Sequence, residues 1–161
     1  VKEKKEESNI IIFGRKEYGK TIVLKYIQNE IFSNDRHYEK MLPVIINFSE
    51  IPKNNPDSIK RIIKNVLDHE VSTEKIETYL QNGYITFLID DFDDYTDDAK
   101  EKRKEVFYKI SQTYPKCRYI LTMNEKLSEA FKQETFTAVS HLKVKNFSKF
   151  VKELIKEKRT K

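Results

Sequence analysis

The sequence has few of the features that mark a secreted or membrane-spanning protein. Its one cysteine, Cys117, excludes an internal disulfide and is typical of a reducing compartment, so we expect a cytoplasmic protein. No apolar run approaches the roughly 20 residues that a helix needs to cross a bilayer, and no secretory signal is visible. We therefore expect no membrane partner. Glycine is also scarce: the chain has only 3, and two of them lie in one short stretch.

Charge is abundant, but it is not of one sign. There are 31 Lys and Arg residues against 26 Asp and Glu residues, which gives a net charge of +5 at pH 7. Because the two signs are interleaved, this pattern is more typical of a solvated surface than of a nucleic-acid groove. The tyrosines form no stripe of alternating basic and aromatic residues. We therefore expect no direct binding of nucleic acid.

The length of 161 residues fits one domain with a substantial core. Residues 1–8 are almost all charged and predict a linker, and residues 9–161 predict the domain itself. The chain begins with Val and ends in a charged helical pattern, so we expect a fragment of a larger multidomain protein.

The stretch that holds two of the glycines matches the phosphate-binding pattern G-x-x-x-x-G-K-[ST]. The apolar run 9–13 predicts a buried strand before it, and apolar residues at helical spacing over 20–32 predict a helix after it. A loop between a strand and a helix N-terminus directs backbone N–H groups and a partial positive charge at a phosphate. The residues expected to bind nucleotide are Gly14, Arg15, Lys16, Glu17, Tyr18, Gly19, Lys20, Thr21 and Ile22.

Within this loop, Lys20 is expected to reach the β- and γ-phosphates, and the Thr21 hydroxyl is expected to bind Mg²⁺. The side chains of Arg15 and Lys16 have two open roles, since they can add charge near the phosphates or simply be solvated. The expected cofactors are ATP and Mg²⁺.

A second apolar strand, 87–90, ends in the carboxylate of Asp90 and fits a Walker B strand. Ligands of parallel sheets bind at the carboxyl ends of the strands, so Asp90 is expected to hold Mg²⁺ beside the loop helix. Three more acids follow. Asp93 or Asp94, with Asp91 behind them, is the expected catalytic carboxylate that polarises the attacking water, although all three can also be solvated loop acids.

Strands alternate with helices, and the central strands are continuous apolar runs, which is typical of parallel strands buried on both faces. We predict an α/β fold, a three-layer αβα sandwich with a parallel sheet of about five strands in the order 5-1-4-3-2. The predicted strands are 9–13, 42–48, 84–90, 118–123 and 137–144. A short helix is expected over 128–133, and Ser148 is expected to cap the last helix.

About 70 residues separate the phosphate loop from the acidic strand, so we expect another strand, 118–123, to lie between their two strands. Thr122 and Asn124 would then lie beside the γ-phosphate in the sensor position of the additional-strand ATPases. The alternative is an ordinary core strand that ends in a turn.

Together these segments resemble a known family. Gly14 to Thr21, Leu88-Ile89-Asp90-Asp91-Phe92-Asp93-Asp94, Tyr119 to Thr122 and Val144 to Ser148 look like the STAND class of P-loop NTPases. A NACHT-like domain is the closest type and an NB-ARC-like domain the second. Asp91 stands where NACHT-like domains carry a small residue, and Asn124 stands where an arginine is frequent.

The resemblance implies a regulated switch between an upstream effector and a downstream sensor. In such proteins ATP supports homo-oligomerisation, which activates the effector, and many bacterial members act in antiphage defence. The implied activity is Mg²⁺-dependent ATP hydrolysis. The alternative is a regulatory module that binds nucleotide with little or no hydrolysis.

Other P-loop classes are disfavoured by what the sequence lacks. Small GTPases need Asp-x-x-Gly after the Mg²⁺ strand and an Asn-Lys-x-Asp base reader, and neither is present. No arginine-rich lid or second substrate motif supports a small-molecule kinase. The missing GTPase motifs favour ATP over GTP.

Overall fold

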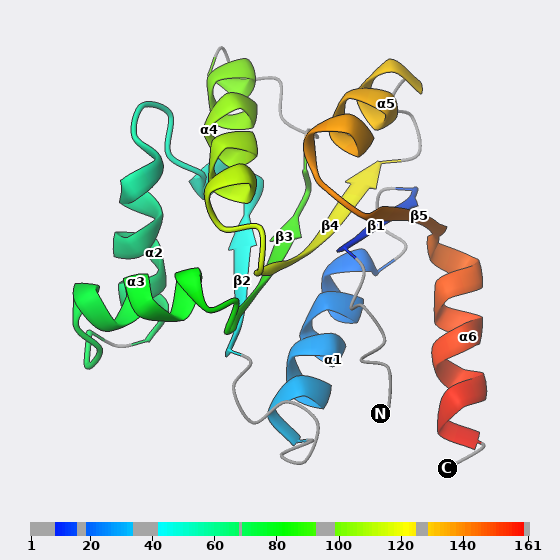
Figure 1. Cartoon of the computed structure of the whole chain (residues 1–161). Helices are drawn as coiled ribbons and strands as arrows, with labels where there is room; N and C mark the ends of the chain where they lie inside the picture. Colours follow the sequence, from blue (N-terminus) through cyan, green and yellow to red (C-terminus); the bar gives the residue numbers. More distant parts are fainter. Residues whose placement is uncertain are drawn as a thin grey trace, which may run out of the picture.

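The chain forms a parallel sheet with helices on both faces (Figure 1). The structure, a computed structural model, describes residues 9–15, 19–33, 42–67, 69–92, 99–124 and 129–159. The predicted linker 1–8 lies outside these residues. Within the described ranges, none of the helices combines the length and the apolar character that a bilayer span requires.

Five strands make up the sheet, in the order β2-β3-β4-β1-β5, and all four strand pairs are parallel. Read from β5, this is the predicted order 5-1-4-3-2. The strands are β1 (Asn9–Gly14), β2 (Leu42–Asn47), β3 (Ile85–Asp90), β4 (Arg118–Asn124) and β5 (Leu142–Asn146). The helices are α1 (Lys20–Ser33), α2 (Ile59–Val66), α3 (Thr73–Gln81), α4 (Lys100–Thr113), α5 (Glu129–Ala138) and α6 (Phe147–Arg159), with short 3₁₀ turns η1 (Phe48–Glu50) and η2 (Pro56–Ser58).

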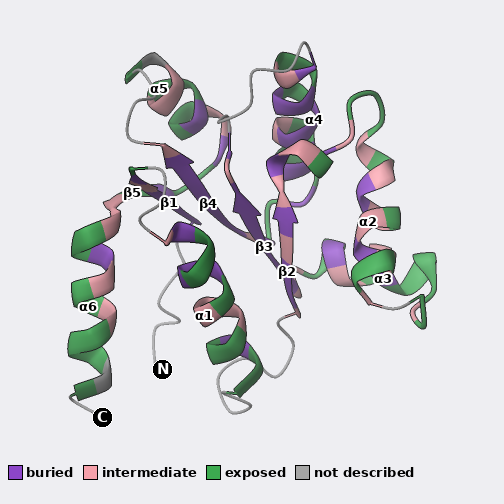
Figure 2. Ribbon diagram, turned by 180° about the vertical axis from the view of Figure 1, so that it is seen from behind, coloured by how far each residue is buried: buried purple, intermediate pink, exposed green. Residues whose placement is uncertain are grey.

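Alternate residues of the strands feed two separate cores, because successive side chains point to opposite faces. Ile10 and Ile12 of β1 pack with α1 and α6, whereas Ile11 joins the larger core under α2, α3 and α4. Figure 2 accordingly shows β1, β3 and β4 buried along almost their whole length, whereas the edge strand β5 is buried only at Leu142. This explains why the central strands read as continuous apolar runs.

The predicted fifth strand, 137–144, was placed too early, and the predicted helix 128–133 was too short. Residues up to Ala138 belong to α5, and β5 begins only at Leu142. The β-branched Thr135 and Thr137 suggest a strand, but in α5 their hydroxyls donate to the carbonyls of Phe131 and Gln133, both at 2.9 Å. Such bonds to the residue four positions back let threonine fit a helix.

The N-terminus of α6 is capped by a different residue from the one predicted. The side-chain Oδ1 of Asn146 accepts from the backbone N–H groups of Ser148 and Lys149, at 3.0 and 3.4 Å. Ser148 is therefore inside the helix, and the cap comes from the last residue of β5.

A polar network at the edge of the larger core connects α2, α3 and the end of α4. Lys60 of α2 contacts Glu77 of α3 at 2.7 Å, and Tyr114, at the end of α4, donates to the same carboxylate at 2.8 Å. Burial alone would raise the pKa of Glu77, but hydrogen bonds from Lys60, Gln81 and Tyr114 outweigh it and hold this pKa below its usual value. The hydrogen bond to Glu77 correspondingly raises the pKa of Lys60.

We predict that Glu77→Gln lowers the stability near neutral pH by about 1 kcal/mol, because a charged partner is lost from three hydrogen bonds. Since the folded-state pKa of Glu77 is lowered, its contribution is present above the unfolded-state pKa and is lost as the pH falls through the folded-state value. The difference in the free energy of unfolding between wild type and Glu77→Gln should therefore shrink on acidification. Urea unfolding at a series of pH values from neutral to acidic measures this difference.

The matched control for this experiment is Glu105→Gln, a change at an exposed position of α4. It should leave the pH dependence of the wild type unchanged. A Glu77→Gln protein whose deficit stays constant down to acidic pH would contradict the assignment of the network.

Candidate nucleotide site

The phosphate loop connects β1 to α1 at the carboxyl edge of the sheet. Gly19 has φ +87°, a left-handed backbone that favours glycine, and its carbonyl accepts the N–H of Val23 at 3.1 Å as the helix begins. Gly14 is required for a different reason, since a Cβ there would lie 2.8 Å from the Cβ of Phe147. Lys16, Glu17 and Tyr18 lie outside the described residues.

Lys20 is the buried cation of this edge, with 7% of its surface exposed. Its Nζ donates to the carbonyl oxygens of Gly14 and Arg15, at 2.9 and 2.8 Å. The ammonium group is thus held inside the loop, at the N-terminus of α1, where the helix adds its own partial positive charge. The side chain of Arg15 is exposed.

Asp90 is the buried anion that faces the loop, with 5% of its surface exposed. Thr21 Oγ1 donates to Asp90 Oδ2 at 2.5 Å, and Thr122 Oγ1 donates to Asp90 Oδ1 at 2.6 Å. Each carboxylate oxygen is therefore tied to a hydroxyl from a different element, α1 on one side and β4 on the other. The two residues predicted to bind the metal, 69 positions apart in sequence, are in direct contact.

The turn after Asp90 is set by Asp91, which has φ +52°. Its backbone N–H lies 2.9 Å from Thr122 Oγ1 and 3.1 Å from Asp90 Oδ1, and the next N–H, that of Phe92, donates to the Thr122 carbonyl at 2.8 Å. The Phe92 ring is fully buried beside Phe48, with centroids 4.9 Å apart. These contacts hold a left-handed aspartate at the edge of the sheet, a conformation that aspartate tolerates better than most residues.

A residue that the sequence analysis did not single out, Asn47, lies against Asp91. Asn47 ends β2 in register with Asp90, and its Nδ2 donates to Asp91 Oδ2 at 3.3 Å. Its Oδ1 accepts from the backbone and the hydroxyl of Ser49, at 3.0 and 2.8 Å, which fixes the orientation of the amide. Its place at the carboxyl end of a strand beside the acidic strand is the signal that could have indicated it.

The two residues predicted as sensors lie in different surroundings. Thr122 is completely buried, and its hydroxyl contacts Asp90 and the N–H of Asp91. Asn124 is half-buried at the end of β4, in register with Gly14 of the phosphate loop. Asp93 and Asp94, the predicted water-polarising acids, lie outside the described residues.

The donor set suits Mg²⁺, which takes hard oxygen ligands and is usually held by one or two carboxylates together with substrate phosphates. Thr21 and Asp90 supply a hydroxyl and a carboxylate in contact at 2.5 Å. Among the residues that the structure describes, no group of three His, Cys, Asp or Glu side chains is close enough to hold a metal without a ligand's help.

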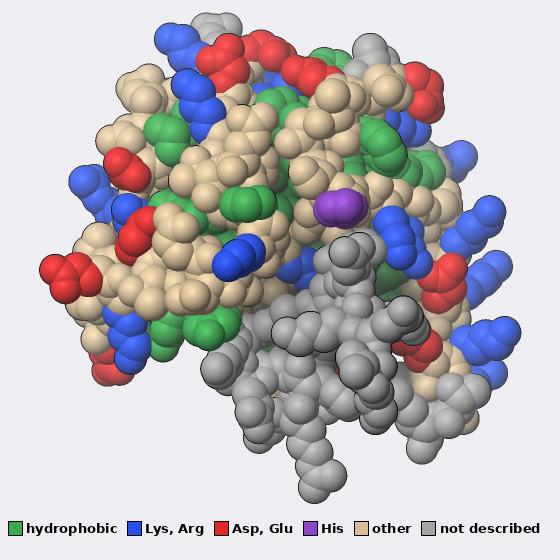
Figure 3. All heavy atoms as spheres, in the orientation of Figure 1, with side chains coloured by type: hydrophobic (Ala, Val, Ile, Leu, Met, Phe, Trp, Pro, Cys, Tyr) green, Lys and Arg blue, Asp and Glu red, His purple; other side chains and the backbone are tan. Residues whose placement is uncertain are grey.

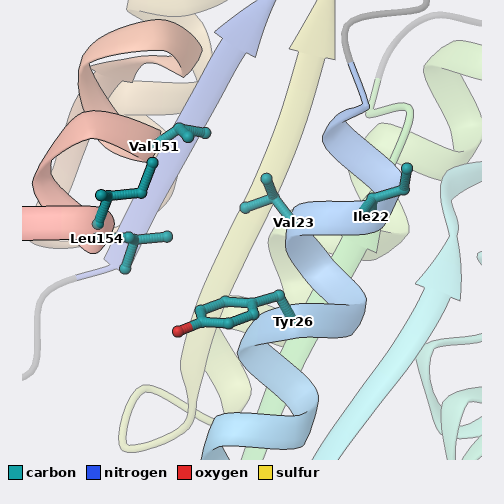
Figure 4. A pocket seen from close by; sticks show the side chains of 6 residues that line it. Ile22, Val23, Tyr26, Val151 and Leu154 are labelled. Atoms are coloured by element: carbon teal, nitrogen blue, oxygen red, sulfur yellow. The ribbon is translucent and has the colours of Figure 1, made fainter. Parts of the chain in front are cut away.

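An apolar groove of about 230 Å³ lies between α1 and α6. Figure 4 shows Val23 and Tyr26 of α1 directed toward Val151 and Leu154 of α6. Its α1 wall starts at Ile22, the residue directly after Thr21, and this side chain is 71% exposed. The groove therefore begins next to the residues that meet at the phosphate loop.

No protein-family model matches the sequence, and no match to a curated protein was found. Solved structures do match. The Aeropyrum pernix ORC2 protein, solved as ADPNP-ADP complexes, superposes with a TM-score of 0.57 at 11% identity, over 86% of this chain and 42% of that one. C. elegans PCH-2 superposes with a TM-score of 0.48 at 17% identity, over 86% of this chain and 34% of that one. AMPPCP-bound Aquifex aeolicus DnaA superposes with a TM-score of 0.44 at 15% identity, over 94% of this chain and 46% of that one. The chain thus spans less than half the length of these proteins, and what the likeness to ORC2 shows is the fold alone, an α/β fold with a parallel sheet.

Proposed function

We propose that this chain is a nucleotide-binding switch domain that takes ATP with Mg²⁺ and hydrolyses it slowly. The observation that carries the proposal is the meeting of Lys20, Thr21 and Asp90 at one edge of the sheet. A buried cation, a hydroxyl and a buried carboxylate come together there from two elements, with Thr21 Oγ1 and Asp90 Oδ2 2.5 Å apart. The occurrence of bound ADPNP and ADP in the structurally similar ORC2 protein supports ATP as the ligand.

Lys20 would bind the phosphates by exchanging its present acceptors. Its Nζ now donates to two loop carbonyls, at 2.9 and 2.8 Å, and an ammonium has three donors. Phosphate oxygens form shorter and stronger bonds with a cation than neutral carbonyls do. The N–H groups at the start of α1 would add to the same site.

Mg²⁺, when bound, would neutralise phosphate charge as it accumulates during hydrolysis. Thr21 and Asp90 would bind it, directly or through water. Thr122 keeps hold of Asp90 Oδ1, so the oxygen that now accepts from Thr21 is the one available to the metal. Thr122 therefore acts on the metal by orienting the Asp90 carboxylate.

Hydrolysis needs a further carboxylate that orients water, and three acids follow Asp90. Asp91 is the one that the structure describes, and its carboxylate accepts from Asn47 at 3.3 Å. Asp93 and Asp94 remain the other proposed bases.

The finer role that we propose is that of a STAND-class, NACHT-like switch. The support is the order of motifs along the chain, namely the phosphate loop, Asp90 with the acids after it, and Thr122. In that class, nucleotide binding drives homo-oligomerisation and effector activation, often in bacterial antiphage defence. The corresponding partners would be an upstream effector and a downstream sensor in a longer chain.

A second candidate function is nucleotide binding with little or no hydrolysis. The contact between Asp91 and Asn47 favours it, because a carboxylate already engaged by an amide is less available to a water molecule. Asn124 in place of an arginine at the end of β4 also favours slow turnover.

The groove beside Ile22 is the proposed place of the nucleotide base. Its lining is almost entirely aliphatic, with the Tyr26 ring on one wall, and flat aromatic bases pack well on such surfaces.

We predict that Lys20→Ala lowers the affinity for Mg²⁺-ATP by about 100-fold or more, because charge-assisted hydrogen bonds to the phosphates are lost. Titration calorimetry measures the loss. Lys25→Ala, on the exposed side of the same helix, is the matched control and should bind like wild type. A native circular-dichroism spectrum together with unchanged ATP affinity in Lys20→Ala would disprove the phosphate site.

Single and paired substitutions of the acids separate the two candidate functions. If the chain hydrolyses ATP, either Asp91→Asn or the pair Asp93→Asn and Asp94→Asn should lower turnover by about 100-fold, with ATP affinity nearly unchanged. Phosphate-release assays identify which acid is the base. A wild-type protein that binds ATP but releases no phosphate would support the binding module instead.

Ile22→Ala should weaken ATP binding by about fivefold to tenfold, since part of an apolar contact with the base is removed. Binding of inorganic tripolyphosphate, which has no base, should be unaffected. An equal loss for both ligands would place Ile22 in the phosphate site and leave the groove without a base.

A further inference from the structure

The positive charge of this chain is concentrated in its last 20 residues. Residues 142–161 contain 8 Lys and Arg residues and 2 Glu residues, a net charge of +6, whereas the whole chain carries +5. The preceding 141 residues therefore sum to −1, with 23 basic and 24 acidic residues. The even mixture of charges suggested by the overall composition thus hides a basic C-terminal segment.

Helix α6 gathers much of this charge on one face. Lys149, Lys152, Lys156 and Arg159 follow one another at spacings of three and four residues, which places them on the same side of the helix. All four are exposed. In Figure 3, blue side chains accordingly gather along the right-hand edge, where Figure 1 shows α6. We call these four residues the α6 basic stripe.

One of the two acidic residues of this helix is engaged by the neighbouring strand. Glu153 contacts Lys145 of β5, with Nζ and Oε2 2.9 Å apart. Glu157, the other, is exposed. Because α6 contains 5 Lys and Arg residues against these 2 glutamates, the helix is predominantly basic.

We infer that the α6 basic stripe is a binding surface for double-stranded DNA, which it contacts through the phosphate backbone. The four cations span about 15 Å along the helix. A DNA duplex carries one negative charge per about 1.7 Å of its axis, so roughly nine phosphates lie within that length and each of the four cations can contact one of them. Contacts of this kind carry no base sequence information.

The packing of α6 favours duplex DNA over single strands. Its aromatic residues, Phe147 and Phe150, pack toward the sheet in the smaller core, so the stripe offers no exposed ring on which bases of a single strand could stack. Val151 and Leu154 line the groove shared with α1, so the apolar side of α6 is turned toward α1.

The test is fluorescence anisotropy with a labelled duplex of about 20 base pairs, over about 50 to 200 mM salt. Wild type should bind duplexes of unrelated sequence alike, and log K should fall linearly with log salt. The stripe variant has Lys149→Gln, Lys152→Gln, Lys156→Gln and Arg159→Gln. Each phosphate contact contributes about 0.9 to the magnitude of the slope of log K against log salt. This magnitude should therefore be smaller by about 3 to 4 in the stripe variant than in wild type.

The matched control carries Lys53→Gln, Lys102→Gln, Lys109→Gln and Lys116→Gln, four exposed positions away from α6. It has the same net charge as the stripe variant and should keep most of the wild-type slope. Glutamine preserves helix propensity, and thermal unfolding confirms that both proteins fold. Should the stripe variant fail to fold, Lys149→Gln with Lys152→Gln alone should lower the slope by about 2.

Three results would overturn the inference. The first is an equal loss of slope in the stripe variant and the control, which would indicate attraction to net charge alone. The second is absence of duplex binding by wild type even at low salt. The third is tighter binding to RNA duplexes, to single strands or to vesicles of anionic lipid than to the DNA duplex.

Discussion

The carboxylate of Asp90 is the centre on which this edge of the molecule depends. Burying an ionised carboxylate is costly unless its oxygens are hydrogen-bonded, and here each oxygen accepts from a threonine hydroxyl, at 2.5 and 2.6 Å. The bond from Thr21 holds the first turn of α1 at the end of β3, and the bond from Thr122 holds β4 at the same carboxylate. The need to satisfy one anion therefore fixes the phosphate loop, the acidic strand and the intervening strand relative to one another.

Most of this arrangement could be predicted from the sequence, because the patterns involved are local. Continuous apolar runs indicated the four strands β1 to β4, and the long separation between the phosphate loop and Asp90 placed β4 between their strands, as the sheet order confirms. Two of the glycines have a local reason, a left-handed backbone: Gly19 has φ +87°, and Gly83, which follows α3, has φ +73°.

The parts that could not be predicted depend on tertiary contacts or on competition between local preferences. Thr135 and Thr137 favour a strand by propensity, but their hydroxyls bond within α5, so the predicted last strand began too early. Asn146 was hidden as a cap because it is also the last residue of β5. Asn47 contacts Asp91 only because β2 and β3 are in register, which spacing along the chain does not reveal.

Charge illustrates the same limit, because a count over the whole chain does not say where charge lies on the surface. The helical periodicity of α6 places four of its basic residues on one side, in a segment whose sequence also contains glutamates. A site for nucleotide at the carboxyl edge and a basic face on α6 would be two separate functions of one small fold.

The most direct test of the central claim is the thermal unfolding of the intact chain with and without Mg²⁺-ATP, with Mg²⁺-GTP and metal-free ATP as controls. Ligand at 100 times its dissociation constant adds about 2.7 kcal/mol, which for a chain of this size raises the melting temperature by about 5 to 10 °C. The account predicts this shift with Mg²⁺-ATP, and a smaller shift when the metal is removed. An unchanged melting temperature in saturating Mg²⁺-ATP and Mg²⁺-GTP alike would contradict it.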